Sequence, residues 1–509
     1  MAIHESRRLS RGRRSTFIAA CFVAHLFSGT ARAQSLPATD PAIAISFDAA
    51  ASRLDSVSHA LSGAGHEVKA ADDTADALKT LHRPVVTVSA QYLEYQKTLS
   101  LDLSGAKSDV TSATDSFLGD LPTQFPSAFQ QIVGEVVGRV QQALPGLLSA
   151  LPNSLSYQYR DDVFRPTIQA VMPLYTGGAI PAIQRGAQAG TDMARARQAE
   201  ARDLSTVNLV RVYFGQQVAI KLLASGTDVR DAFDRHLSDT RRLEQQGIVP
   251  HATTLEVQVA RDAAERSRLR AELDARTASD ELGRLLDADA GVTPTTPLFV
   301  DAGPLPPVGD FLGGSDLPRA READAARELA DAGTALAKSR FLPQAYAFGE
   351  YNFDHKQALP TEPDWVVGVG VRYTLLSNID RRKTLDAARE HARAAADAAA
   401  DARKTLTTET IRAYDLVETA RQSFLLLDSD IAAAQENLRV QQISFREGEA
   451  NGAAVTDAIA ALQAAETQRI ATAYEYDLAL AGLLAASGRL PEFSDYLARA
   501  DYRLAPHHP

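Results

Sequence analysis

The sequence predicts a mainly α-helical fold with some β-strands, arranged as two copies of one unit. Two similar turn sequences are centred on Gly247 and Gly448, which lie 448 − 247 = 201 residues apart. Two long stretches, 180–246 and 379–447, contain no proline after their first turn, as long helices require. Four shorter segments alternate apolar and polar residues, which is typical of strands with two different faces.

The same offset aligns other positions of the two halves. It pairs Arg211 with Arg412, Tyr213 with Tyr414, and Glu256 with Asp457. An offset that is held over this length without an insertion indicates an internal duplication. Each copy is predicted to form a strand, a long helix, a tight turn and a second long helix. We expect the paired tyrosines to pack between helices.

The N-terminus has the pattern of a secretory signal peptide. Five arginines between Arg7 and Arg14 precede a mostly apolar run and the site Ala31-Arg32-Ala33. We therefore expect residues 1–33 to be removed and the mature chain to begin at Gln34. The segment that ends at Cys21 is also similar to a lipoprotein cleavage box. Lipidation ranks second, because the apolar run continues well past this cysteine.

The composition argues against several functions. The chain has 53 Lys and Arg against 64 Asp and Glu, so its net charge of −11 does not suit binding to a nucleic-acid backbone. Its one cysteine lies in the predicted signal peptide, so the mature chain has no disulfide or thiolate metal site. His251 and the pair His507-His508 do not form a metal-ligand set. No nucleophile is paired with a base at recognisable spacing, so neither an enzyme nor a cofactor is predicted.

The strands are predicted from their alternation. Residues 45–82 predict two short helices that end before Pro84, because proline disfavours helical geometry in the preceding residue. A strand then alternates through Val86, Val88, Ala90 and Tyr92. Three more strands are predicted at 167–174, 343–353 and 365–375. Each alone is also typical of a soluble sheet, but together with a signal peptide they suit a barrel with lipid outside and water inside.

The helices are long and must have neighbours. A span of 180–246, if continuous, reaches roughly 100 Å at 1.5 Å per residue. A helix of that length cannot bury itself in a small globule, so we expect coiled-coil pairs. The first strand pair also carries an insertion at about 97–162. Part of it places Phe129, Val133, Val136 and Val140 on one helical face, and we expect this helix to cover or enter the mouth of a barrel. A partner-binding element is the alternative.

The predicted organisation follows the chain in order. It comprises a signal peptide (1–33), N-terminal helices (34–82), a first β-hairpin with the inserted loop (83–176), a first long helical hairpin (177–291), a linker (292–315), a helix (316–341), a second β-hairpin (342–376), a second long helical hairpin (377–488) and a C-terminal tail (489–509).

Several motifs resemble one known family. The strand end PLYTGG, the helix motifs VRVY and IRAY, and the opening RFLPQAYAFGEY of the second β-hairpin are similar to the TolC family of outer-membrane efflux channels. So are the turn sequences QQGIVPHATTLEVQVA and REGEANGAAVTDAIAA. The resemblance covers residues 45–488 and includes the duplication.

The resemblance implies a trimer with a hollow α-helical barrel in the periplasm and a shared twelve-stranded β-barrel in the outer-membrane lipid, four strands from each chain. Elementary physics points the same way, because four strands cannot close a barrel and lipid does not tolerate open sheet edges. The implied function is a passive exit channel of a tripartite efflux or type I secretion system. Its partners would be a periplasmic adaptor protein and an inner-membrane pump.

The resemblance also implies two kinds of functional site. Adaptor docking is expected at the tip turns, here Gly247 with Ile248 and Gly448 with Glu449. An acidic ring that gates the pore is expected nine residues after each glycine, which is the position of Glu256 and Asp457. The family's other acidic positions, six residues after each glycine, are Thr253 and Ala454 here, so this ring carries fewer charges.

The alternative is a periplasmic coiled-coil adaptor or scaffold protein without a pore. Such a protein would carry one helical hairpin and would lack the four alternating strands. A hydrolase is a distant third.

Overall fold

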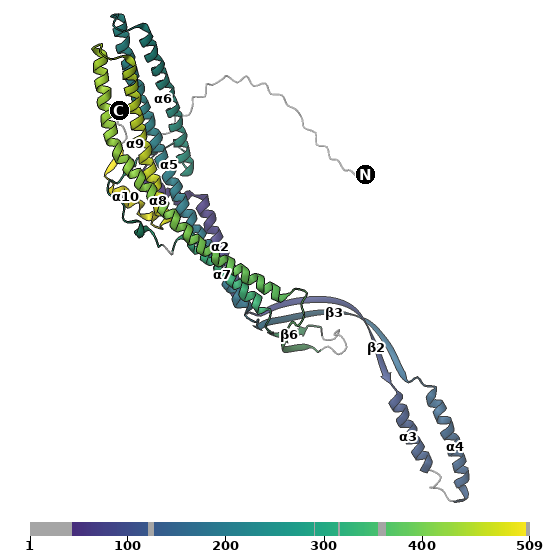
Figure 1. Cartoon of the computed structure of the whole chain (residues 1–509). Coiled ribbons are helices and arrows are strands. Elements are labelled where there is room, and N and C mark those ends of the chain that lie inside the picture. The colour runs from purple at the N-terminus through teal and green to yellow at the C-terminus, as the bar shows by residue number, and fades with distance from the viewer. Residues whose placement is uncertain (1–42, 121–126, 290, 314–315, 355–362, 505–509) are drawn as a thin grey trace, which may run out of the picture.

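The chain is elongated, with a sheet between two helical ends (Figure 1). The computed structural model describes residues 43–120, 127–289, 291–313, 316–354 and 363–504. The predicted signal peptide, with Cys21 and the expected cleavage site, lies outside these residues, as do His507 and His508.

The duplication organises the structure. The first repeat consists of α2 (His59–Lys79), β2 (Val85–Asp102), β3 (Ser154–Tyr175), α5 (Ala179–Gln245) and α6 (His251–Leu285). The second consists of α7 (Pro318–Ser339), β6 (Gln344–Asn352), β7 (Trp365–Arg372), α8 (Arg381–Arg446) and α9 (Gly452–Ala486). The helices α6 and α9 begin 452 − 251 = 201 residues apart, which is the offset found in the sequence.

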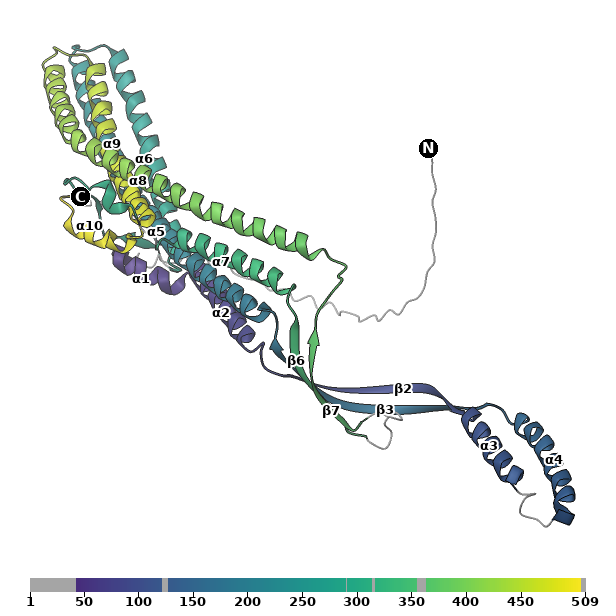
Figure 2. The ribbon, with the colours of Figure 1, turned by 60° about the horizontal axis from the view of Figure 1, so that its bottom comes forward.

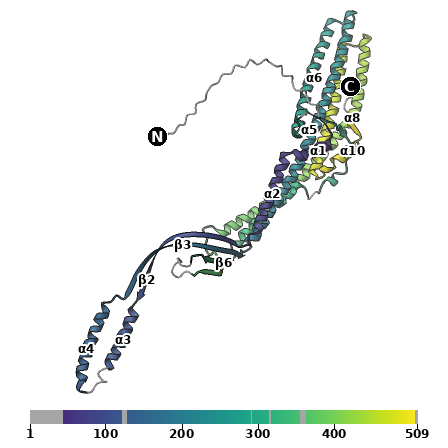
Figure 3. The ribbon, with the colours of Figure 1, turned by 180° about the vertical axis from the view of Figure 1, so that it is seen from behind.

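Each long helix packs against two other helices of its own repeat, one near each of its ends. Near the sheet α5 packs against α2, and near the tip it packs against α6 (Figures 1 and 3). In the same way α8 packs against α7 and then α9. Contacts of α5 with α7 and α9 join the two repeats. The helices are therefore stabilised by side-by-side pairing over their whole length, as their amphipathic sequences require.

The four strands form one antiparallel sheet in the order β2-β3-β6-β7. Its edges within the described chain are β2 and β7. β2 and β3 pair along their full length, from Val85 opposite Val171 to Asp102 opposite Ser154. β6 pairs with β3 only over Thr167–Tyr175, so the β2–β3 hairpin projects far beyond β6 and β7 (Figure 2).

A smaller structural unit packs against the middle of the long helices. It contains α1 (Phe47–Val57), a parallel pair of β1 (Ile43–Ile45) with β4 (Val292–Pro294), and an antiparallel pair of β5 (Leu298–Val300) with β8 (Tyr502–Leu504). The short helices η2 (Val308–Phe311), η3 (Leu490–Glu492) and α10 (Phe493–Arg499) complete it.

Aromatic side chains form the core of this middle unit. The ring of Phe47 lies 5.5 Å from Phe214 and 5.1 Å from Phe493. Tyr213 is fully buried, donates its hydroxyl hydrogen to the Ile45 carbonyl at 2.8 Å, and accepts from the Thr296 N–H at 2.9 Å. Tyr213 therefore packs between elements as expected, and it also ties β1 to the segment between β4 and β5.

Two segments differ from their sequence-based description. The stretch 292–315 was expected to be a surface linker, but Leu298, Phe299 and Val300 in it are completely buried. The C-terminal tail supplies α10 and β8, which pack against the same core. These segments form structure because they pair with each other and with distant parts of the chain.

The insertion also differs from its expected form. Residues 97–102 and 154–162 extend β2 and β3, and only the part between them forms helices, α3 (Ser104–Asp120) and α4 (Ser127–Ser149). These two helices stand at the far end of the β2–β3 hairpin, away from β6 and β7 in both views (Figures 1 and 2). Within one chain they neither cover nor enter the space beside the sheet.

None of the helices in the described residues combines the length and the apolar character that would let it cross a membrane.

Candidate functional site

The two helical hairpins turn on glycines with positive φ. Gly247 has φ 73° and Gly448 has φ 79°, which is the left-handed region that other residues rarely adopt. The N–H of Ile248 donates to the Leu243 carbonyl at 2.9 Å, and the N–H of Glu449 donates to the Ser444 carbonyl at 2.8 Å. These bonds satisfy the last carbonyls of α5 and α8, as in a Schellman motif. Ile248 is 53% exposed and Glu449 is also exposed, so both project into solvent at the tips.

The two tips touch each other. A Cβ placed on Gly452, the first residue of α9, would lie 2.7 Å from the Cγ2 of Thr253 in α6. The Nε2 of buried His236 lies 3.1 Å from the Gly452 carbonyl oxygen, and its ring packs on Phe445 with the centroids 4.9 Å apart. Burial lowers the pKa of His236, which favours the neutral ring and hence donation from Nε2 to the carbonyl. The repeats are therefore joined at the tip by close backbone approach.

The two predicted gate residues lie just inside these tips. Glu256 is in the second turn of α6 and Asp457 in the second turn of α9, and both are exposed. The residue that follows each of them in the sequence is buried: Val257 in α6 and Ala458 in α9. Within the described residues neither carboxylate forms an ion pair or hydrogen bond, so both are available to whatever lies beside the tips in an assembly.

A hydrogen-bonded group at the first tip was not predicted from the sequence. Glu244 accepts from the Thr254 hydroxyl at 2.5 Å, and its other oxygen lies 2.7 Å from the Nδ1 of His251. The Thr254 and His251 hydrogen bonds hold the pKa of Glu244 below its usual range. His251 is solvent-exposed, but it also ties the start of α6 to the end of α5. The one sequence feature that could have predicted this hydrogen-bonded group is the spacing from 244 to 251 across a tight turn.

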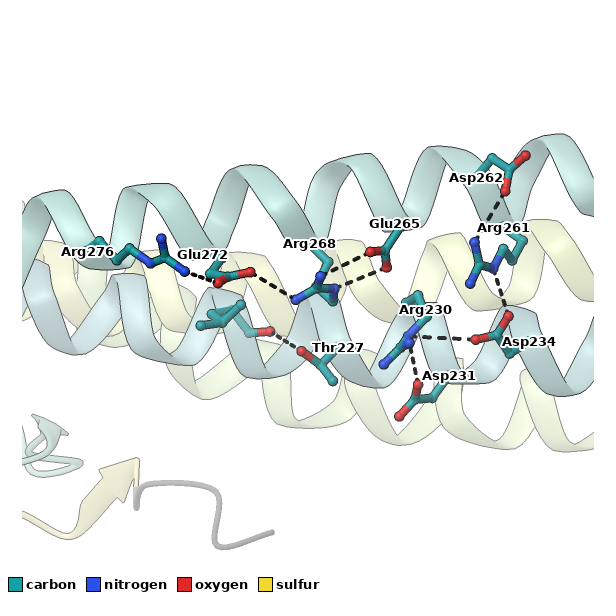
Figure 4. Close-up of polar contacts among 11 residues, drawn as sticks. Thr227, Arg230, Asp231, Asp234, Arg261, Asp262, Glu265, Arg268, Glu272 and Arg276 are labelled. Carbon is teal, nitrogen blue, oxygen red and sulfur yellow. Dashed lines mark hydrogen bonds and ion pairs between the residues drawn. The ribbon is translucent and has the colours of Figure 1, made fainter. Parts of the chain in front are cut away.

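Behind the first tip, charged residues line the contact between α5 and α6 (Figure 4). The guanidinium of Arg261 in α6 lies 2.7 Å from Asp234 in α5, and this pair crosses between the helices. Arg268 bonds Glu265 at 3.0 Å and Glu272 at 3.3 Å along α6. The Glu265 hydrogen bond raises the pKa of Arg268, so this charge is held firmly.

The second repeat lacks this crossing pair. At the positions that match Asp234 and Arg261 it has Gln435 and Leu462, which cannot form an ion pair. There α8 and α9 are joined instead by Arg469 and Asp428, 2.7 Å apart. The two helical hairpins thus have similar backbones, but different ion pairs join the two helices of each.

The sheet has one wholly apolar face. Register pairing places on it seventeen positions, none of which is charged: Val86, Val88, Ala90, Tyr92, Phe164, Pro166, Ile168, Ala170, Met172, Ala345, Ala347, Gly349, Tyr351, Trp365, Val367, Val369 and Val371. Val367, Val369 and Val371 are 73%, 69% and 72% exposed. A contiguous exposed apolar face of this kind marks contact with lipid or with a partner surface.

The opposite face of the sheet is polar in its outer half. Arg165 and Glu350 form an ion pair at 2.6 Å, and the hydroxyls of Ser89 and Thr167 are hydrogen-bonded at 2.9 Å. At the other end of the same face Tyr346 covers Gly370, where a Cβ would lie 2.6 Å from the ring. A strand pair with one lipid-compatible and one water-compatible face is the arrangement of a membrane barrel wall.

A search of the described residues for three or more His, Cys, Asp or Glu side chains that could hold a metal ion finds no such group.

Comparisons with known proteins agree with this geometry. The sequence model of the outer membrane efflux protein family matches residues 318–489, which is the second repeat. No curated protein matches the chain by sequence.

Solved structures match nearly the whole chain. The structure of CusC has a TM-score of 0.68 at 12% identity, over 89% of this chain and 95% of that one. The outer membrane protein VceC from Vibrio cholerae has a TM-score of 0.65 at 13% identity, over 87% and 96%. The open-state MtrE outer membrane channel of Neisseria gonorrhoeae has a TM-score of 0.63 at 15% identity, over 87% and 89%.

The predicted class of fold, mainly α with β in the manner of TolC-like channels, is confirmed by this likeness. The match of the second repeat and the likeness to solved outer-membrane channels confirm the resemblance carried by the turn and strand motifs, and the second repeat is similar to the outer membrane efflux protein family.

Proposed function

We propose that this protein is the outer-membrane exit channel of a tripartite efflux or type I secretion system. The observation that carries the proposal is the sheet, whose seventeen-position apolar face is uncharged and partly exposed while its other face is polar in its outer half. β6 spans nine residues, within the about 9–11 that a tilted strand needs to cross a bilayer. Lipid would cover the apolar face, and water would fill the space on the other side.

The sheet must continue into other chains to exist in lipid. β2 and β7 are its edges within the described chain, and their unpaired backbone groups would each cost several kcal/mol in hydrocarbon. Three copies joined edge to edge close a barrel, since β7 of one copy can then pair with β2 of the next. We therefore infer a homotrimer with twelve strands in the outer membrane.

The helices would continue this wall into the periplasm. Their polar, exposed surfaces suit water on both sides of a tube, and the tips lie at the end of the chain farthest from the sheet (Figure 1). A periplasmic adaptor would dock on the tip turns, contacting Ile248 beside Gly247 and Glu449 beside Gly448. The inner-membrane pump would supply the energy, and the channel would be passive.

Glu256 and Asp457 would gate the periplasmic entrance. Both are exposed and without partners in the described chain, and both follow their tip glycine by nine residues. Three copies would bring six carboxylates toward one axis. Thr253, six residues after Gly247, packs on Gly452 instead of adding charge.

The alternative of a periplasmic adaptor or scaffold lacks support from the architecture. The chain carries two helical hairpins and a four-stranded sheet, whereas an adaptor would have one hairpin and no such wall.

The proposal is tested with two variants of the sheet. Val369→Lys places a charge on the apolar face, where a lysine at the bilayer midplane costs about 2–4 kcal/mol. Thr87→Lys, the control, places the same charge on the polar face. Wild type and Thr87→Lys should fractionate with the outer membrane as trimers and conduct ions in planar bilayers, and Val369→Lys should fail to assemble. Equal assembly of both variants would contradict the proposed wall.

A further inference from the structure

The β2–β3 hairpin continues well beyond the part of the sheet that it shares with β6 and β7. We name its distal part, Leu93–Asp102 with Ser154–Val163, the outer ribbon. Pairing of β2 with β3 runs unbroken through it, while β3 meets β6 only from Thr167 onward. Figure 2 shows the outer ribbon leading away from β6 and β7 toward α3 and α4.

A band of aromatic residues marks where the apolar face ends. Tyr92 is paired with Phe164, and Tyr351 with Trp365, all on the apolar face near its outer limit. These side chains are 69%, 50%, 40% and 65% exposed, respectively. Aromatic girdles of this kind sit at the membrane–water boundary of barrels. The outer ribbon therefore begins where the membrane ends.

The polarity of the two faces changes at this level. Past Tyr92 and Phe164 the outward face becomes polar and stays exposed: Glu94, Gln96, Thr98, Ser100, Asp102, Ser154, Ser156, Gln158, Arg160 and Asp162. Arg160 also lies 3.8 Å from Glu94 on this face. The opposite face has apolar positions at its two ends, with the charged positions Lys97 and Asp161 between them. The apolar positions are Leu93, Tyr95 and Val163 near the membrane zone and Leu101 and Leu155 at the distal end.

The polarity of its two faces indicates what each face of the outer ribbon contacts. Its polar outward face excludes lipid, so the ribbon stands in water. Its opposite face is the continuation of the face that lines the channel, so it is directed toward the axis. Leu101 and Leu155, paired near the distal end, are 57% and 53% exposed even with α3 and α4 in place. No described part of the chain covers them fully, and in the proposed trimer the same face of two further copies would lie across the axis.

The number of strands argues for a closed arrangement. Twelve strands would surround the pore in the membrane, but only β2 and β3 of each chain continue outward, which leaves six. Barrels of about eight strands already have an interior just wide enough to be filled by side chains. Six strands with apolar residues pointing inward leave still less room.

We propose that the outer ribbons of three copies of this chain pack the distal ends of their inner faces together at Leu101 and Leu155, on the channel axis, and form a hydrophobic constriction outside the membrane. The proposal rests on the proposed trimeric channel and extends it with an outer gate. Such constrictions block ions by excluding water until they are pushed apart. α3 and α4 stand beyond this constriction, and the exposed Val110, Phe117 and Leu147 in them extend the apolar surface available to the assembly.

The first test locates the ribbons by crosslinking. Leu101→Cys places a thiol on the inner face, and Ser100→Cys, the control, places one on the outer face of the same strand. In outer-membrane trimers under a mild oxidant, Leu101→Cys should give disulfide-linked dimers and Ser100→Cys should not. A second pair, Leu155→Cys with Ser156→Cys, repeats the comparison on β3. Equal crosslinking within a pair, or none at Leu101 and Leu155, overturns the proposal.

The second test measures the pore. Replacing residues 97–159 by Asn-Gly, a sequence that favours tight hairpin turns, removes most of the outer ribbon with α3 and α4. The single-channel conductance of this variant in planar bilayers should rise several-fold over wild type. Leu101→Ser combined with Leu155→Ser, which keeps the length, should raise it in the same direction.

The two proposals fail in different ways. Trimers that conduct but show no gain in conductance in either variant overturn the constriction and leave the channel standing. Wild-type protein that forms no trimer and no pore overturns both.

Discussion

Thr253 at the start of α6 and Gly452 at the start of α9 are in direct contact, and this contact joins the two repeats at the tips. A Cβ on Gly452 would lie 2.7 Å from the Cγ2 of Thr253 and 3.6 Å from Phe445. The glycine is therefore required by packing between repeats, in contrast to Gly247 and Gly448, which are required by their positive φ.

Gly452→Ala should loosen the tips. Overpacking of this kind typically costs about 1–3 kcal/mol. We expect a lower midpoint of thermal unfolding by circular dichroism in detergent, together with more rapid proteolysis at the tips. Gly190→Ala in α5 is the control, because no atom lies within 4 Å of its added Cβ and alanine favours helix by about 1 kcal/mol. A Gly452→Ala variant as stable as Gly190→Ala would contradict the packing argument.

Removing the proposed gate charges should change selectivity. Two carboxylates about 6 Å apart repel by about 0.7 kcal/mol even in bulk water, so a ring of them attracts cations. Glu256→Gln with Asp457→Asn should lower cation selectivity and abolish block by trivalent cations in planar bilayers.

The matched control for the gate is Asp274→Asn with Glu475→Gln. These exposed acids lie farther along α6 and α9, also 475 − 274 = 201 residues apart, and the change removes the same charge. Selectivity that falls equally in both double variants would assign the effect to overall charge and not to a ring.

The buried carboxyl of Asp477 in α9 should make stability depend on pH. Burial raises its pKa well above the usual range, and the backbone N–H of Phe299 offsets this only in part. A group whose pKa is raised on folding stabilises the protein fully below its unfolded pKa, about 3.9, and that stabilisation is lost as the pH rises through the folded value.

Asp477→Asn should therefore flatten the pH dependence. Between pH 5 and pH 8 the thermal midpoint of wild type should fall as the pH rises, and the variant should lose part of that slope. Asp415→Asn, at an exposed position of α8, should keep the wild-type slope. Identical slopes in wild type and Asp477→Asn would show that this carboxyl does not control the transition.

The hydroxyl group of Tyr213 should contribute to the stability of the folded protein. Tyr213→Phe keeps the ring but leaves the Thr296 N–H without its partner, at a cost of about 1–3 kcal/mol. The Ile45 carbonyl loses one bond and keeps the one it accepts from the Thr295 N–H at 2.9 Å. Tyr414→Phe, at the matching position of the second repeat, is the control, since Tyr414 packs on Phe311 with the ring centroids 5.9 Å apart. Chemical denaturation should show a clearly larger loss for Tyr213→Phe, and equal losses would refute the hydroxyl's role.

Processing of the N-terminus remains a prediction, because residues 1–42 lie outside the described chain. The intact mass of protein isolated from the outer membrane should correspond to a chain that begins at Gln34 without lipid. An acylated chain that begins at Cys21 would support the alternative cleavage site.

The sequence by itself determined the duplicated helical part of this protein. The long helices, their turns at Gly247 and Gly448, and the matched positions of Glu256 and Asp457 all follow from local periodicity and one repeated offset. Such features depend on residues that are close together in the sequence or related by the repeat. They can therefore be predicted without knowledge of the tertiary contacts.

Only the tertiary structure decided the middle unit and the outer ribbon. β5 pairs with β8 across more than 200 residues, and three-residue strands carry too short a pattern to predict that partnership. In the outer ribbon the alternation breaks at Tyr92-Leu93 and at Val163-Phe164, where two apolar residues are adjacent. The predicted first strand is followed only to Tyr92 and the second begins at 167, so the pairing beyond them is not predicted. The strands continue because their backbones remain paired as far as Asp102 and Ser154, and the alternation of side chains along one strand does not encode that pairing.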